Sequence, residues 1–331
     1  MGTIGGVLVQ WSSLVPLATF GPHRDGEFAL IDWIRRHVDP HPRLTVGIGD
    51  DAAALDLGDE QLALVATDML VEGVHFLFSE ATPEQVGHKA LAVNLSDIAA
   101  MAGIPVAAVV CLALPRSEGQ ELGRRLHSGL ARLAQQIGVA VAGGDTTSTD
   151  GPLVISVTVI GLSPPQGPVL RSGARPGDRL LVTGPLGSSR SGHHLDFHPR
   201  LDEARCLLQS GGLHALIDIS DGLAADLYHL LDESRVGARV RASDIPMRPV
   251  PAGTHDGRTP LDHALCDGED FELLAAVEPT AAEALLAASP ISDLTCIGQI
   301  TSGTAAELEM PDGRVLPLPR IGYTHPFDPG T

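Results

Sequence analysis

Acidic turns follow short apolar stretches at several places along this chain. They are Asp50 and Asp51, Thr67 and Asp68, residues 143–147, and residues 218–222. Strands end at turns of this kind, and α/β proteins bind ligands at the carboxyl ends of their strands. Acids gathered there repel one another unless a cation neutralises them, and Mg²⁺ prefers oxygen ligands that it shares with substrate phosphates. The pattern predicts an α/β enzyme that binds magnesium and a nucleotide.

The composition narrows the class of protein. With 331 residues and 44% hydrophobic residues, the chain can bury a large core and is expected to form two domains. A net charge of -19 and only 3% aromatic residues exclude the basic or aromatic surfaces that bind nucleic acids. The four cysteines, Cys111, Cys206, Cys266 and Cys296, form no Cys-x-x-Cys pair, which favours a reduced cytoplasmic protein without a zinc or iron-sulfur site.

The apolar segment 6–20 is too short to span a membrane, and Gln10 to Ser13 interrupt it. No membrane partner is therefore expected. We interpret residues 1–25 as an N-terminal extension, 26–165 as a first domain that binds ATP and magnesium and forms a dimer, and 166–331 as a second domain that binds substrate and phosphate. The proline-rich stretch 163–168 marks the boundary between the two domains.

Hydrophobic periodicity predicts alternating helices and strands in both domains. Helices are expected at 28–38, 83–101, 118–137 and from about 218 to 231, and strands at 62–67, 106–114, 138–142, 153–162, 179–183, 237–242 and 271–277. Residues 187–213 show weak periodicity and are rich in glycine, serine and histidine, which predicts an irregular, mobile segment. Its histidines, His193, His194 and His198, are interpreted as surface residues.

Each acid also has an ordinary structural explanation. Asp50 and Asp51 fit a solvated turn equally well, and their side chains diverge, so they would bind different groups. Asp97 is the more informative acid, because it lies inside an apolar helix where a carboxylate needs either a metal or an arginine partner. Helix capping explains one of Asp218 and Asp221 but not both, which favours a metal-phosphate role. Asp145 follows two glycines that allow a phosphate to approach the backbone.

Familiar catalytic motifs are missing from the sequence. It contains no Gly-x-x-x-x-Gly-Lys-Ser/Thr loop, no Gly-x-Gly-x-x-Gly, no His-Glu-x-x-His and no Gly-x-Ser-x-Gly. A nucleotide enzyme with this sequence binds phosphates without a P-loop.

Several blocks together resemble the thiamine-monophosphate kinase family. The blocks are residues 47–53, 67–76, 89–101, 143–147, 171–178, 218–223 and 268–273, and the resemblance runs from about Gly26 to Tyr323. It implies a two-domain α/β architecture with mixed sheets, like that of aminoimidazole ribonucleotide synthetase. The implied reaction is direct in-line transfer of the γ-phosphoryl group of ATP to thiamine monophosphate, a step in thiamine diphosphate biosynthesis. Several Mg²⁺ ions would assist, and no general base is required because the attacking phosphate oxygen is already anionic.

The resemblance also implies roles for individual residues and a homodimer formed through the N-terminal domains. Magnesium ligands would be Asp51, Thr67, Asp68, Asp97, Asp145, Asp218 and Asp221. ATP would contact Gly144, Asp145, Arg171 and Ser220, and the thiamine phosphate would contact His75, Glu269 and Tyr323. An aromatic ring such as Tyr323 would stack on the substrate, and Glu269 would accept from its aminopyrimidine or offset its thiazolium charge.

The sequence departs from the family pattern at Ala66, where serine is usual, at Asp267, where glycine is usual, and in the shortened segment 187–213. Two alternatives stay open. One is an ATP-dependent enzyme of the same superfamily with another small acceptor, although the cysteines that two such relatives need are missing. The other is a catalytically weak sensor of nucleotide or thiamine phosphate, against which the full set of acids argues.

Overall fold

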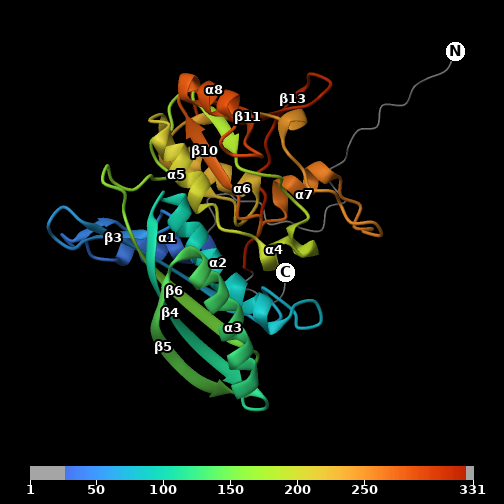
Figure 1. The fold of residues 1–331 in the computed structure, drawn as a ribbon. Helices are drawn as coiled ribbons and strands as arrows, with labels where there is room; N and C mark the ends of the chain where they lie inside the picture. The colour runs from blue at the N-terminus through green and yellow to red at the C-terminus, as the bar shows by residue number, and fades with distance from the viewer. Residues whose placement is uncertain (1–26, 326–331) are drawn as a thin grey trace.

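The computed structural model describes residues 27–325, and the two sheets of the chain lie one above the other in Figure 1. The N-terminal extension 1–25 lies outside the described residues. Six strands form the first sheet, in the order β1-β2-β3-β6-β4-β5. They are β1 Leu44–Val46, β2 Ala53–Asp56, β3 Leu62–Val71, β4 Ile104–Pro115, β5 Ala140–Thr149 and β6 Val154–Leu162. Only the β4 and β5 pair in this sheet is parallel, so the predicted mixed sheet is present.

Two long helices, α2 Pro83–Ala100 and α3 Gly119–Ile137, pack on one face of this sheet. Thr82 and Gln85 form a capping box at the start of α2, which satisfies backbone N–H groups that the helix itself cannot pair. The two helices approach each other through glycines. A Cβ atom added at Gly87 would lie 1.9 Å from the Leu126 oxygen, and one at Gly129 would lie 1.8 Å from the Glu84 oxygen. Close packing of α2 and α3 therefore requires both glycines.

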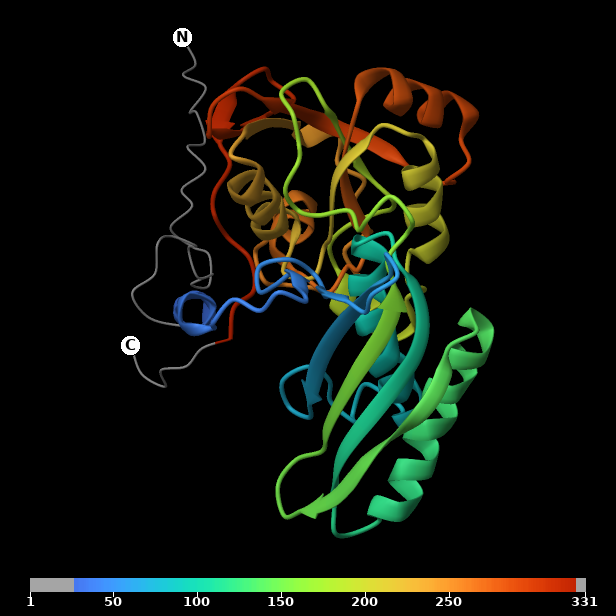
Figure 2. The same ribbon diagram turned by 90° about the vertical axis from the view of Figure 1, so that its left-hand side faces the viewer.

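The opposite face of the first sheet carries exposed apolar side chains. Met69 is 57% exposed, Ile104 50%, Val106 43% and Ile160 40%. Figure 2 shows α3 running beside β4 and β5, with no described helix on the other side of these strands. This surface is called the open face below.

The second sheet has seven strands, in the order β13-β12-β9-β11-β7-β10-β8. They are β7 Arg179–Val182, β8 Leu213–Asp218, β9 Gly237–Arg241, β10 Leu273–Val277, β11 Thr295–Thr301, β12 Ala306–Glu309 and β13 Val315–Pro317. Alternating residues of β7 enter different apolar cores, with Leu181 in one and Leu180 and Val182 in the other. Helices α5 Leu201–Gln209 and α8 Pro279–Ala288 contribute to the first core, and α6 Leu223–Ser234 and α7 Pro260–Cys266 to the second. The sheet is thus covered on both faces.

Three expectations about local structure were wrong. β3 continues to Val71, so Thr67 and Asp68 lie within the strand and not at its end. β5 likewise runs through Asp145, because its pairing with β4 continues to Thr149. Residues 187–213 are not irregular, since they form the 3-10 turn η2 Ser189–Ser191 and the helices α4 His193–Asp196 and α5.

The histidines of that segment also differ from expectation. His194 is buried and His193 is partly buried, while His198 is exposed as predicted. Contacts to α2 hold the segment. Gln85 donates to Asp196 at 2.8 Å, and His88 Nε2 lies 2.8 Å from the Phe197 oxygen. Segment 187–213 therefore connects the two domains. The remaining described elements are α1 Glu27–His37 and η3 Ala242–Asp244, and no helix within 27–325 is long and apolar enough to cross a membrane.

Candidate active site between the domains

A cavity of about 370 Å³ lies between the two domains. The first sheet and α2 provide one wall, and the loops after β8 and before β10 provide the other. The predicted site residues that line it are Thr67, Asp68, His75, Asp97, Asp218, Ser220, Asp221, Glu269 and Tyr323. The first and last of these residues, Thr67 and Tyr323, are 256 positions apart in the sequence, and the fold brings them to one place.

Three carboxylates converge at the floor of this cleft. One oxygen from each of Asp51, Asp97 and Asp218 lies within 4.8 Å of the others. Asp51 precedes β2, Asp97 projects from the interior of α2 as predicted, and Asp218 ends β8. Asp68 lies near Asp97, and burial and the charge of Asp68 both raise the pKa of Asp97.

The pKa values of these groups reflect burial and mutual repulsion. Burial and the nearby Asp51 charge raise the pKa of Asp218 to about 8. Burial, with the charges of Asp68 and Asp218, raises the pKa of Asp97 well above its usual range. Burial, with the charge of Glu27, raises the pKa of Asp221 to about 7. A bound cation stabilises the anionic form of carboxyl groups whose pKa is raised in this way.

The guanidinium of Arg171 places a positive charge of the chain itself beside these acids. Its Nη2 donates to Asp51 Oδ1 at 2.6 Å, while its backbone N–H donates to Asp50 Oδ1 at 3.0 Å. Asp50 and Asp51 therefore both contact Arg171, one through its backbone and the other through its guanidinium. The other oxygen of Asp51, Oδ2, is buried and has no hydrogen-bond partner. An unpartnered carboxylate oxygen among hard oxygen donors is suited to Mg²⁺.

Several polar side chains support the acids, and sequence reasoning missed them. Ser96 Oγ donates to Asp218 Oδ2 at 2.5 Å, and Asn94 Oδ1 accepts the backbone N–H of Asp68 at 3.0 Å. Asp226 Oδ2 accepts the N–H groups of Asp221 and Gly222, which shapes the turn before α6. Asn94 lies three residues before Asp97, so helical spacing is the sequence signal for the proximity of these two; Ser96, next to Asp97, has no such signal.

A second group of residues lies at the other end of the cavity. The rings of His75 and His325 are 5.2 Å apart, and those of Tyr323 and His325 are 5.0 Å apart. Glu269 lies on the loop before β10, and Lys89 of α2 donates to its Oε1 at 2.5 Å. Lys89 and His325 were not predicted as site residues. The cavity thus has a wall of aromatic rings and the acid Glu269 at one end, and the cluster of aspartates at its floor.

The side chain of Thr67 points away from the acidic cluster, and Gly144 and Asp145 lie apart from it. The Thr67 hydroxyl contacts Thr158 Oγ1 at 2.9 Å, on the sheet face opposite to that of Asp68, so only its backbone oxygen can reach the cleft. Gly144 and Asp145 lie on the exposed edge strand β5. In the sheet register, Asp68 pairs with Val157, Val157 with Val110 and Val110 with Gly144. Three interstrand spacings of about 4.8 Å place Gly144 about 14 Å from Asp68.

A second cavity, of about 280 Å³, adjoins Gly144. It lies between β4, β5 and α3 and is mainly apolar, with lining residues that include Leu126, His127, Leu130 and Val141. A Cβ atom added at Gly144 would lie 1.7 Å from the Val110 oxygen, so this glycine is required for the close pairing of β4 and β5. Gly143, by contrast, has open space around its Cα.

Comparison with known proteins places the chain in a family. The family model "AIR synthase related protein, N-terminal domain" matches residues 49–163, and the model of the corresponding C-terminal domain matches residues 175–310. The chain is 40% identical over 287 residues to the thiamine-monophosphate kinase of Rhodopirellula baltica, covering 84% of this chain and 90% of that protein. The chain belongs to the thiamine-monophosphate kinase family. The Bacillus subtilis enzyme of this family is 35% identical, covering 90% of this chain and 99% of that enzyme.

Solved structures of the kinase family share the architecture. The structure titled "AaThiL complexed with AMPPCP and TMP" matches with a TM-score of 0.75 and 31% identity, covering 90% of this chain and 97% of that one. The family resemblance and the two-domain fold expected from the sequence are both confirmed. The hydrogenase maturation protein HypE, at 22% identity and a TM-score of 0.64, shares the fold alone.

Proposed function

We propose that this chain catalyses transfer of the γ-phosphoryl group of ATP to the phosphate of thiamine monophosphate, forming thiamine diphosphate and ADP. One observation carries the proposal beyond family membership. The carboxylates of Asp51, Asp97 and Asp218 converge, with a buried unpartnered oxygen on Asp51, beside a cavity that holds an acid and an aromatic wall. Such a site suits a substrate that joins a phosphate to a cationic heterocycle.

Each part of the site has a chemical role in the proposal. Asp51, Asp68, Asp97, Asp218 and Asp221, with the Thr67 backbone oxygen, would hold several Mg²⁺ ions, which neutralise the phosphates when bound. Ser220 lies between two of these acids and would contact the ATP phosphates. His75, Tyr323 and Glu269 would hold the thiamine phosphate at the other end of the cavity. Because the acceptor oxygen is anionic, catalysis consists of placing two phosphates in line and needs no general base.

ATP would lie between the two cavities. The apolar cavity beside Gly144 is suited to an adenine ring, and the Arg171 guanidinium lies next to the acidic floor. A separation of about 14 Å between Gly144 and Asp68, estimated from three interstrand spacings, is one that an extended nucleoside triphosphate can span. Asp145 would then meet the nucleotide from the β5 side and serve as a further magnesium ligand.

We further propose a homodimer in the cytoplasm. The open face, with Met69, Ile104, Val106 and Ile160 exposed, is an apolar patch of the kind that marks an interface. All four cysteines lie among the described residues and are free, which suits a reducing compartment.

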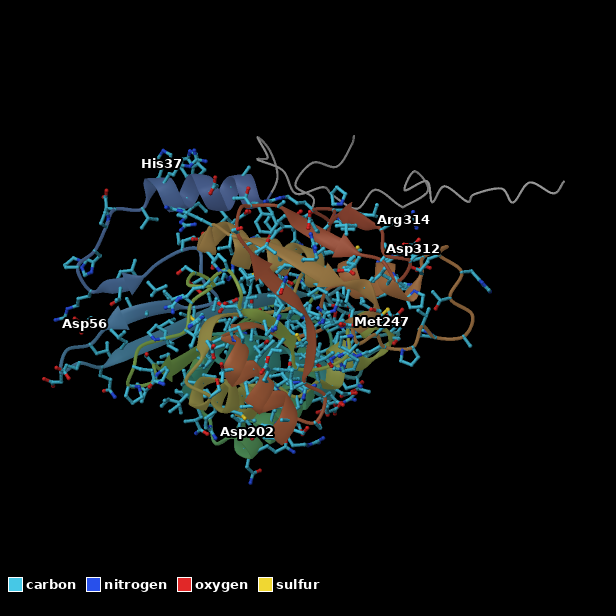
Figure 3. The ribbon with its side chains drawn as sticks, turned by 90° about the horizontal axis from the view of Figure 1, so that it is seen from above. His37, Asp56, Asp202, Met247, Asp312 and Arg314 are labelled. Carbon is cyan, nitrogen blue, oxygen red and sulfur yellow. The ribbon has the colours of Figure 1, made fainter. Side chains whose placement is uncertain are left out.

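The first test is formation of ADP and thiamine diphosphate from ATP and thiamine monophosphate. We expect turnover that requires Mg²⁺ and falls at least about a hundredfold in Asp51→Asn and in Asp218→Asn, because each variant loses one anionic ligand. Asp202→Asn is the matched control. Asp202 has a side chain that is 84% exposed, lies at the edge of the molecule in Figure 3 and does not line the cleft cavity.

Two outcomes would contradict the proposal. ADP release that does not depend on thiamine monophosphate would indicate another acceptor. ATP binding without turnover, unchanged in the two cleft variants, would favour a nucleotide sensor.

A further inference from the structure

Lys89 is a buried lysine that the phosphoryl-transfer scheme leaves unused. It projects from α2, its side chain is 0% exposed, and it is among the largest fully buried side chains of the described chain. A lysine in such a position needs partners for all three of its N–H donors, because an unpaired buried charge is strongly destabilising. The groups that accept these hydrogen bonds therefore indicate the role of Lys89.

Three acceptors surround the Lys89 ammonium. Nζ donates to the His75 backbone oxygen at 2.8 Å and to Glu269 Oε1 at 2.5 Å, and it lies 2.8 Å from His194 Nδ1. An ammonium group has three donors and no lone pair, so Nδ1 of His194 must accept the third hydrogen bond. That nitrogen consequently carries no proton.

The absence of a proton on His194 Nδ1 affects the hydrogen bonding of Glu269. His194 Nδ1 lies 3.2 Å from Glu269 Oε2, but without a proton it cannot donate to that oxygen. Oε2 is buried, and it has no hydrogen-bond partner. The nearest other cation is Arg190, whose Nε lies 4.0 Å away and whose side chain is 57% exposed. Arg190 and Glu269 both line the cleft cavity, so a donor bound there lies next to this carboxylate.

The backbone of Glu269 is also held in an unusual conformation. Glu269 has φ of 56° and Phe271 has φ of 51°, which lie in the left-handed region that few side chains adopt. The Glu269 N–H donates to the Ser220 oxygen at 2.6 Å and the Phe271 N–H to the Ile219 oxygen at 2.8 Å. Strain retained at a cavity wall and fixed by such contacts is typical of a preorganised binding residue.

We propose that Lys89 is a positioning residue for acceptor recognition, a role that rests on the proposed function. It fixes the Glu269 carboxylate through Oε1 and occupies His194 Nδ1, which keeps Oε2 free as an acceptor for an N–H donor of the substrate. The amino group of an aminopyrimidine is a donor of this class. Lys89 itself does not touch the substrate, and it also couples segment 187–213 to the substrate end of the cavity through His194.

The test compares Glu269→Gln with the double variant Lys89→Met and Glu269→Gln, using Michaelis constants for both substrates. We expect Glu269→Gln to raise KM for thiamine monophosphate by about tenfold to a hundredfold, the loss associated with a hydrogen bond to a charged group, and to leave KM for ATP unchanged. Adding Lys89→Met should change neither constant by more than about twofold, because Lys89 acts only through Glu269. The double variant removes both charges and is expected to fold, since no unpaired buried charge remains.

Lys89→Met alone gives the complementary measurement. Methionine keeps an unbranched side chain of similar length but leaves Glu269 without its cation, so KM for thiamine monophosphate should rise about as much as in Glu269→Gln. The role of Lys89 is overturned if this variant turns over with an unchanged KM, if both KM values rise equally, or if the double variant binds thiamine monophosphate much more weakly than Glu269→Gln. A wild-type protein that forms no thiamine diphosphate instead overturns the proposed function.

Discussion

Protonation of single carboxyl groups links the cleft to pH. The pKa of Asp218 rises from 3.8 to about 8 on burial beside Asp51, and that of Asp221 rises to about 7 on burial near Glu27. These two carboxyl groups therefore bind more protons in the folded chain than in the unfolded chain between about pH 4 and pH 8. Within that range, their contribution to the free energy of unfolding of the metal-free protein falls as the pH rises, because they lose protons more readily when unfolded.

Magnesium should reverse this loss of stability. Because the ion competes with the bound protons, we expect Mg²⁺ to raise Tm by roughly 1–3 °C more at pH 8 than at pH 6, equivalent to about 1–2 kcal/mol for a chain of this size. Thermal melts in chelator and in Mg²⁺ at the two pH values measure the difference. Asp218→Asn should make it smaller. An equal rise in Tm at both pH values would show that the cluster does not bind the ion through these groups.

At the scale of single elements, the position of helix α2 depends on its contact with α3. Asp97, Asn94, Ser96 and Lys89 all project from α2, so the position of this helix sets the geometry of the whole cleft. Its position depends on contact between the backbones of the two helices at glycines, which side-chain periodicity does not reveal.

Alanine at these glycines should push the helices apart. We expect Gly129→Ala to destabilise the protein by about 1–3 kcal/mol, because its Cβ would lie 1.8 Å from the Glu84 oxygen and a backbone has to shift. Gly123→Ala in the same helix is the control, since its Cβ would meet only the Leu114 side chain, at 3.2 Å, and alanine favours the helix by about 0.5–1 kcal/mol. Urea titration measures both variants. Equal stability of the two variants would refute the close-contact argument.

At the scale of the whole molecule, the open face predicts that two copies of the chain form a dimer. A charge at Ile160, in the middle of this face, would be desolvated on association, so we expect Ile160→Asp to be monomeric where the wild type is a dimer. Val315→Asp is the matched control, because Val315 is 44% exposed but lies on β13 of the other domain. Light scattering after size-exclusion chromatography gives the masses. A monomeric wild type, or a dimer that survives Ile160→Asp, would contradict this interface.

The α/β class, most element positions and the identity of the acids follow from the sequence by itself. Hydrophobic periodicity and turn residues are local properties, so they locate α2 and β4 and place Asp97 inside a helix. The absence of a P-loop is likewise visible in the sequence. The family resemblance added the roles of the acids, which remain proposals.

Tertiary structure alone decided which of these residues meet. Asp51, Asp97 and Asp218 come from separate elements, and their distances depend on how two domains pack. Strand register, a long-range property, placed Gly144 and Asp145 on an edge strand and turned the Thr67 hydroxyl away from the cleft. Burial of His194 against Lys89 depends on contacts between residues 105 positions apart, so local composition predicted an irregular surface segment where the fold forms helices. Sequence patterns report local preference, whereas burial and convergence are decided by long-range packing.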